Sequence, residues 1–192
     1  MAAMTTDQKL VIAASALLDS GGDEAVTLRA VGRAVGVSHN APYKHFESRN
    51  ALLAAVAVAH FATLTDMFRS IRRSAAKPTT KLKRAFKIII DCGHENPARY
   101  RLLFSNPDIA AQGGELERTA LATFGEFAEI VRECQSAGQL PGISNKALTG
   151  LLFSTMHGLI DREASGRMRP DKGLSGVRPS MDLLIQLLSP NK

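Results

Sequence analysis

The chain has 192 residues, of which 24 are basic and 18 acidic, so its formal net charge at pH 7 is +6. Apolar residues make up 45% and charged residues 22%, which are the proportions of a soluble globular chain of one or two domains with enough apolar material for a core. Aromatic residues contribute only 5%, Trp is absent, and Ala and Leu are abundant, so helices are favoured over a β-sandwich.

The first predicted helix begins after Thr5, which forms a capping box with Gln8, and it ends at Gly21. Thr27 then caps a second helix of about two turns, which Gly36 closes.

A short third helix is predicted for residues 38–46, although Pro42 falls inside it. With Ser38 as N-cap, Pro42 takes the fourth helical position and removes only the first intrahelical hydrogen bond, so we expect the helix to survive with a slightly strained first turn. Ser48 caps a long fourth helix that Pro78 interrupts. Further helical patterns cover residues 82–93, 98–104, 116–134, 147–159 and 177–188. The expected fold is all-α with about nine helices.

Other classes of protein are disfavoured. Two cysteines, Cys92 and Cys134, are too few for a disulfide framework or a Cys-based zinc site. Residues 1–18 lack the features of a signal peptide, and we expect no segment with the length of a membrane span, so the expected location is the cytoplasm, without membrane contact. The positive charge says little about DNA, because residues 1–73 carry eight basic and six acidic side chains, only +2 of the total.

Residues 27–46 have the spacing of a helix-turn-helix, in which two short helices are joined by a tight turn and the second helix enters the major groove. Gly36 suits the left-handed backbone of such a turn, and Gly32 in mid-helix suggests a close approach by the crossing helix. Small polar side chains that can reach base edges follow the turn, and Asn pairs well with adenine. Side chains of the types that hold DNA phosphates come next in the sequence. The base-reading candidates are Ser38, His39 and Asn40, and the clamping candidates are Tyr43, Lys44 and His45.

At these residues the sequence resembles the TetR family of bacterial transcriptional regulators. The resemblance rests on the run from Thr27 to Ser38 and the run from Tyr43 to Leu52, with Arg49 where the family usually has Lys. It implies that phosphates are gripped by Thr27, Tyr43, His45 and Arg49. It also implies that bases or adjacent backbone are faced by Ser38, His39, Asn40 and Lys44. Residues 152–159 resemble the subclass marked by Trp, His and Gly, with Phe153 in the Trp position.

The resemblance implies residues 4–64 as the DNA-binding domain and residues 65–192 as the ligand-binding and dimerisation domain. Family members are homodimers, usually repressors, in which a small molecule moves the fourth helix and re-spaces the DNA heads. Such a dimer reads a near-palindromic operator with recognition helices roughly 34 to 36 Å apart. No cofactor is expected.

Apolar residues of the C-terminal part supply candidates for both the pocket and the dimer interface. Rings at helical spacing, which are also ordinary core residues, could wall an apolar cavity together with a histidine: Phe61, Phe68, Phe86, Tyr100, Phe104, Phe124, Phe127 and His157. Two apolar helix faces suit a bundle interface: Leu148, Leu152, Thr155, Met156 and Leu159, with Met181, Leu184, Ile185 and Leu188.

Two rival functions remain. One is a small helical enzyme that uses Asp91, His94 and Glu95, which lie at i, i+3 and i+4 and could also hold a metal. Against it, the chain lacks the motifs of common enzyme classes, and His94 and Glu95 sit where a helix must end before Pro97, so neither a catalytic nor a metal role is expected. The other is a binding protein without regulation. A basic run over residues 69–87 is expected to be a solvated face, and its alternative is contact with an anionic ligand or with DNA.

Overall fold

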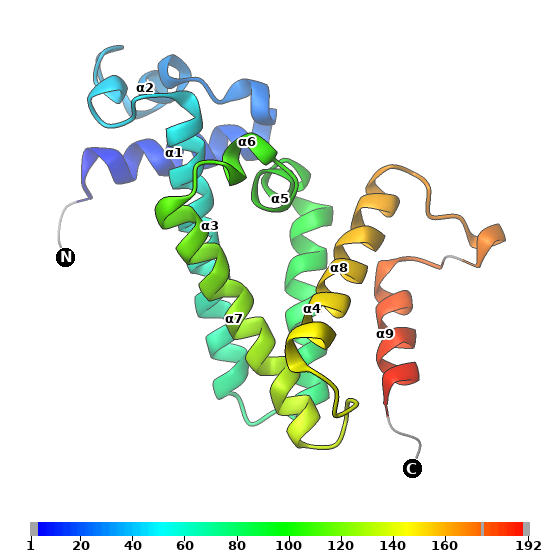
Figure 1. Cartoon of the computed structure of the whole chain (residues 1–192). Helices are drawn as coiled ribbons and strands as arrows, with labels where there is room; N and C mark the ends of the chain where they lie inside the picture. The colour runs from blue at the N-terminus through cyan, green and yellow to red at the C-terminus, as the bar shows by residue number, and fades with distance from the viewer. Residues whose placement is uncertain (1–3, 174, 190–192) are drawn as a thin grey trace. The chain divides into compact units, whose positions relative to one another are not determined.

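A computed structural model describes residues 4–173 and 175–189 of the chain (Figure 1). Among these residues it contains nine α-helices and no strand, which confirms the expected all-α fold. The α-helices are α1 (Thr6–Gly21), α2 (Leu28–Val35), α3 (Arg49–Arg73), α4 (Pro78–Glu95), α5 (Pro97–Phe104), α6 (Pro107–Ala110), α7 (Gly114–Ser136), α8 (Asn145–Ala164) and α9 (Val177–Leu188). Three short 3₁₀ helices accompany them, η1 (Asp23–Ala25), η2 (Pro42–Lys44) and η3 (Pro170–Lys172).

The expected number of helices is correct, but one predicted helix is absent and one unpredicted helix is present. The α-helix predicted for residues 38–46 is replaced by a turn and the single 3₁₀ turn η2, whereas the short α6 was not predicted. Helix α6 forms because Asn106 accepts a hydrogen bond from the Ile109 amide at 3.2 Å and Pro107 occupies the first turn.

The predicted helix starts are confirmed by their caps. Gln8 Oε1 accepts from the Thr5 amide at 3.0 Å before α1. The hydroxyl of Ser48 accepts from the Ala51 amide at 3.0 Å at the start of α3. Each bond satisfies an amide that the first helical turn would otherwise leave unpaired.

The chain divides into two compact units, which are described separately. The first contains the residues up to Leu64 together with Asn96–Leu121. Its core includes Leu10, Leu18 and Leu52, each without solvent exposure. Helix α5 packs on α1 in this unit, where Arg99 on α5 makes an ion pair with Asp19 on α1. By packing, residues 96–121 thus belong with the N-terminal helices, and the functional assignment of 4–64 and 65–192 stays a prediction.

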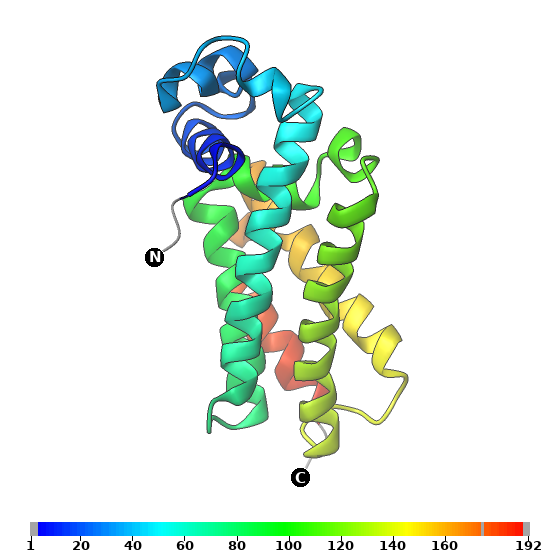
Figure 2. The same ribbon diagram turned by 90° about the vertical axis from the view of Figure 1, so that its left-hand side faces the viewer.

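The second unit contains Thr65–Glu95 and the residues from Ala122 onward. Within it α4 runs back antiparallel to the end of α3 (Figure 2), where Lys81 Nζ donates to the Arg72 carbonyl at 2.6 Å. Helices α4, α8 and α9 pack against one another pairwise. Fully buried Leu82 and Leu152, from α4 and α8, lie in its core.

The expectation that no segment is long enough to cross a membrane was wrong for α3. This helix of 25 residues has a mean hydropathy of 1.7 over an 18-residue stretch, so by length and composition alone it could cross a membrane. However, 44% of that stretch is buried in the protein, including Leu52, Leu53 and Val56. The same pattern is typical of a core helix in a soluble protein, so it is weak evidence for a membrane span.

Candidate functional site

The first helix of the predicted helix-turn-helix ends in a sharp left-handed turn. The Thr27 hydroxyl accepts from the Ala30 amide at 3.0 Å and starts α2. Gly36 adopts φ 75° and ψ 28°, and the Val37 amide then donates to the Gly32 carbonyl at 3.0 Å. This pattern closes the helix and needs the left-handed residue that Gly tolerates best. The predicted turn is therefore confirmed.

The segment after the turn is not the α-helix that the sequence predicted. Hydrogen bonds in it mostly span three residues, from Ala41 N to the Ser38 carbonyl at 3.0 Å and from Lys44 N to the Ala41 carbonyl at 3.1 Å. Pro42 has no amide to donate to Ser38, and its ring crowds the preceding turn, so the chain closes shorter 3₁₀-type turns instead. The Pro42 carbonyl still accepts from the amides of His45 and Phe46, at 3.0 and 2.9 Å.

Gly32 explains how this segment is held against α2. A Cβ at residue 32 would lie 2.9 Å from Cγ of Pro42 and 3.4 Å from its Cδ. Both residues are buried, so the proline ring occupies the space left by the missing side chain. The close approach predicted from Gly32 is present, and the partner is the ring of Pro42.

The side chains predicted to contact DNA lie on the surface of this segment. Tyr43 has 53% of its surface exposed. Six further candidates are also exposed, namely Thr27, Ser38, His39, Asn40, Lys44 and His45. The fold therefore presents seven of the eight candidates to solvent, and their contacts with DNA stay a prediction.

Arg49 is the exception, because intramolecular contacts hold its guanidinium. Its Nε donates to the Val26 carbonyl at 2.7 Å, and Nη2 lies 3.0 Å from the carboxylate of Asp23. Its side chain is 35% exposed. Arg49 thus ties the start of α3 to the loop before α2, a role that sequence reasoning missed because Asp23 lies outside the motif.

A second polar group of the first unit surrounds His60 on α3. Its Nε2 shares a hydrogen bond of 2.8 Å with the hydroxyl of Ser15 on α1. Burial lowers the pKa of His60 to about 4, and the positive charge of Arg99 contributes to the lowering. The ring is therefore neutral at pH 7, which suits a packed contact between α1 and α3.

The aromatic residues predicted to line one pocket fall into two clusters, one in each unit. In the first unit the Phe104 ring lies 5.7 Å from that of Phe61 and 5.2 Å from that of Tyr100. In the second unit the ring of Phe127 lies 6.1 Å from that of Phe68 and 5.6 Å from that of Phe86. Such distances are those of packed aromatic pairs.

The second cluster continues onto α8 through Phe153, the residue in the Trp position. Its ring lies 5.2 Å from that of Phe124 and 4.2 Å from that of His157. Burial lowers the pKa of His157 to about 4. Thr149 shares this face of α8, since 149, 153 and 157 follow at intervals of four. Its hydroxyl is buried without a hydrogen-bond partner among the described residues. Sequence reasoning missed it because the pattern along a helix does not show which polar side chain is left without a partner in the core.

The residues of the alternative enzyme do not form a common site. Asp91 pairs with Lys87 and with Arg178, whereas His94 pairs with Glu163. Glu95 is exposed. In the part of the chain that the structure describes, no group of three or more His, Cys, Asp or Glu side chains could hold a metal ion.

The basic run over residues 69–87 is largely paired. Arg72 contacts Glu126 at 2.5 Å and Glu133 at 3.3 Å, and Lys81 contacts Glu133 at 2.9 Å. Arg69 also contacts Glu126, at 2.8 Å. The run is therefore tied to α7 by ion pairs, and only part of it is the solvated face that the sequence suggested.

The residues predicted for a dimer interface divide between core and surface. Five are buried in their own unit, Leu148, Leu152, Met156, Met181 and Ile185. These five residues pack in the core and support α8 and α9 from inside. The predicted faces were therefore centred about one residue away from the exposed side of each helix. Thr155, Leu159, Leu184 and Leu188 are half-buried. The large apolar residues exposed on these helices are Leu151, Leu183 and Leu187, at 53%, 54% and 74%.

Comparison with known families agrees with these features. Residues 10–56 match the family described as bacterial regulatory proteins, tetR family. Residues 82–188, more than half of the chain, match the tetracyclin repressor-like C-terminal domain. The chain belongs to the TetR family. It is a DNA-binding transcriptional regulator, and its C-terminal part is of the tetracyclin repressor-like type.

Solved structures share the fold of this TetR-family chain at low sequence identity. A protein of unknown function from Rhodococcus sp. RHA1 has a TM-score of 0.78 and 23% identity, covering 97% of each chain. The fatty acid degradation regulator FadR from Bacillus halodurans has a TM-score of 0.72 and 13% identity, over 98% of this chain and 97% of its own. FadR from Thermus thermophilus, solved with lauroyl-CoA, has a TM-score of 0.65 and 18% identity, over 95% and 92%. No curated protein matches the sequence.

Proposed function

We propose that this regulator is a cytoplasmic homodimer without catalytic activity, which represses transcription at a near-palindromic operator and leaves it when a small molecule binds. The observation that carries the DNA-binding part is the segment from Ser38 to His45. The Gly36 turn and the Pro42 contact hold it against α2, and it exposes side chains able to bind bases and phosphates.

The proposed roles follow from side-chain chemistry. Ser38, His39 and Asn40, with Lys44, face bases or adjacent backbone. Thr27, Tyr43 and His45 bind phosphate oxygens. Arg49 positions the start of α3 through Asp23 and offers the exposed part of its guanidinium to a phosphate.

Random-site selection followed by gel shifts tests these roles. We expect a palindrome to be selected. Asn40→Ala should relax selection at one base position by about 1 to 3 kcal/mol, whereas Lys44→Ala should flatten the slope of log affinity against log salt by about one unit. Arg118→Ala is the matched control, because Arg118 is an exposed cation of the same unit outside the motif. Equal effects of Lys44→Ala and Arg118→Ala would reject the proposed surface.

The proposed dimer surface is the exposed apolar side of α8 and α9. Leu151 on α8 and Leu183 and Leu187 on α9 leave more than half of their surface in water, which association would cover. We expect Leu187→Glu to produce monomers in sedimentation experiments. Leu121→Glu replaces a leucine that is 62% exposed in the other unit, and it should leave the dimer intact. A dimer that survives Leu187→Glu would place the interface elsewhere.

The proposed effector is a mainly apolar molecule with one hydrogen-bonding group. Support comes from the rings of Phe124, Phe127 and Phe153 and from the buried Thr149 hydroxyl on the same cluster. Lauroyl-CoA, the ligand of the Thermus thermophilus structure, is the first probe. We expect it to release DNA in gel shifts, and Thr149→Val to raise the concentration required. Release that is insensitive to Thr149→Val would remove this residue from the site.

A further inference from the structure

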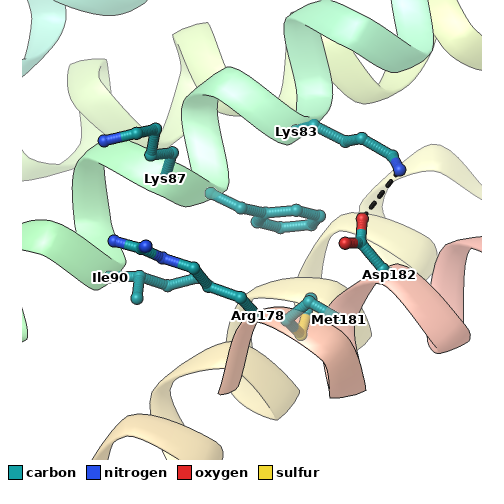
Figure 3. A pocket seen from close by; sticks show the side chains of 7 residues that line it. Lys83, Lys87, Ile90, Arg178, Met181 and Asp182 are labelled. Carbon is teal, nitrogen blue, oxygen red and sulfur yellow. Dashed lines mark ion pairs between the residues drawn. The ribbon is translucent and has the colours of Figure 1, made fainter. Parts of the chain in front are cut away.

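An open groove lies between α4 and α9 in the second unit (Figure 3). Its volume is about 200 Å³. Apolar side chains and charged side chains both line it, namely Phe86, Ile90 and Met181, with Lys83, Lys87, Arg178 and Asp182. The sequence suggested Phe86 for a ligand pocket and, as an alternative, the basic run with Lys83 and Lys87 for contact with an anionic ligand or with DNA, but neither the sequence nor the family match assigns a function to the groove as a whole.

The two ends of the groove differ in charge. At one end Lys83 pairs with Asp182 at 2.7 Å, so the two charges balance (Figure 3). At the other end Lys87 and Arg178 extend toward the same side, and both pair with the single carboxylate of Asp91. Two cations that share one anion leave a net charge of +1 at this end.

The groove has an apolar floor beneath these charges. Phe86, Ile90 and Met181 are each 2% exposed, yet they border the groove. Lys87 and Arg178, in contrast, have 65% and 55% of their side chains exposed, so they can turn toward a ligand at little cost. Because the three apolar side chains are almost fully covered, a ligand reaches them only after Lys87 and Arg178 have turned. The groove then offers an apolar floor with two cations at one end, which is complementary to an anion that carries an apolar body.

The size of the groove limits the ligand. Its volume is about 200 Å³. This is smaller than the pockets of drug-sized ligands, which start at roughly 300 Å³. A body of one or two fused rings fits this space, and any larger part of a ligand would extend out of the open groove into solvent.

We propose that the groove between α4 and α9 binds a small organic carboxylate, whose carboxylate meets Lys87 and Arg178 and whose apolar body lies over Phe86, Ile90 and Met181. The carboxylate competes with Asp91 for the two cations. The site is separate from the proposed dimer side of α9, because Arg178 and Asp182 follow one row of that helix and Leu183 and Leu187 follow the next. It does not depend on DNA binding, and it borders the proposed effector cluster, because the ring of Phe86 lies 5.6 Å from that of Phe127.

The test uses 2-naphthoate and the neutral 2-naphthamide of the same shape, added to the full chain carrying ¹³C-methyl methionine. We expect 2-naphthoate to shift the Met181 methyl resonance, since an aromatic ring stacked on the floor changes the local magnetic field. The fully buried Met156 should stay in place. The amide should bind at least tenfold more weakly.

Three variants separate ligand binding from a structural role of the charges. The double variant Lys87→Gln with Arg178→Gln should weaken 2-naphthoate about tenfold. Asp91→Asn breaks the same two ion pairs but frees both cations, so it should tighten binding several-fold. Arg84→Gln removes an exposed cation of α4 that does not line the groove, and should change the affinity less than twofold.

The possible results distinguish the explanations. If Asp91→Asn weakens binding as the double variant does, the ion pairs only hold the helices together and the proposal is wrong. Equal loss with Arg84→Gln would mean unspecific attraction, which also overturns it. Binding of 2-naphthoate without a Met181 shift would place the ligand at another site. Because the readout contains no DNA, these outcomes leave the proposed regulator function untouched.

Discussion

Replacing Gly32 by Ala tests how the DNA-facing segment is held. Two effects oppose each other at this position. Ala is favoured over Gly inside a helix by about 1 kcal/mol. However, the new Cβ would lie 2.9 Å from Pro42 Cγ, whereas ordinary contacts begin at 3.4 Å, so the ring must move by 3.4 − 2.9 = 0.5 Å. Overpacking of this kind costs about 1 to 3 kcal/mol. We therefore expect a net loss of about 1 kcal/mol, the difference between a 2 kcal/mol clash and the propensity gain.

Thermal unfolding provides the measurement, and Gly125→Ala provides the control. Gly125 lies inside α7, and an added Cβ there meets nothing within 4 Å. That variant should raise Tm by about 2 to 4 °C, whereas Gly32→Ala should lower it by about the same amount. In Gly32→Ala the free energy of operator binding should decrease by more than the free energy of unfolding, because the displaced ring of Pro42 carries Tyr43 and Lys44 with it.

A double variant identifies the contact directly. Pro42→Ala removes the ring atoms that Gly32→Ala would strike, so the two changes together should cost less than the sum of the single effects, by about 1 kcal/mol or more. If Gly32→Ala instead raised Tm as Gly125→Ala does, or if the two changes were additive, the packing of this ring against α2 would not determine the position of the segment.

Two further predictions concern other parts of the fold. The pKa of His60 is about 4 in the folded protein and about 6.5 in the unfolded chain, so the unfolded state binds the proton more readily. The unfolding free energy should thus be fully retained above pH 6.5 and fall as the pH drops toward 4, and His60→Gln should flatten this fall in urea titrations at several pH values. Arg72→Ala should lower the unfolding free energy by about 1 kcal/mol, since it removes contacts to Glu126 and Glu133. The exposed neighbouring Arg73→Ala should change little, and equal losses would show that the ion pairs contribute nothing.

Local chemistry made most of the helices predictable from the sequence. Thr27 and Ser48 each have a side-chain oxygen placed to accept an amide, and Gly36 tolerates a left-handed backbone, so these residues mark helix ends without tertiary information. The segment 38–46 was predicted wrongly because counting from Ser38 gives the bonds that Pro42 removes but not the shorter turns that replace them. The short α6 depends on Asn106 and Pro107 and carries little apolar periodicity.

The candidate sites were less predictable, because their partners lie far away in the sequence. The basic run appeared solvated, since Glu126 is more than fifty residues from Arg69 and Arg72. The interface faces of α8 and α9 were displaced because an amphipathic pattern shows that a helix has an apolar side, whereas the boundary between buried Leu152 and exposed Leu151 depends on the neighbouring helices.

The division of the chain has a practical consequence for exchanging DNA heads between relatives. The unit that holds α1 and α2 also includes residues 96–121, which come from the middle of the sequence. A chimera that transplants residues 4–64 alone would leave behind the ring of Phe104, which packs on Phe61, and the guanidinium of Arg99, which pairs with Asp19. A grafted head that keeps its own specificity and stability must therefore be moved as two pieces of sequence, 4–64 and 96–121, chosen from the same parent.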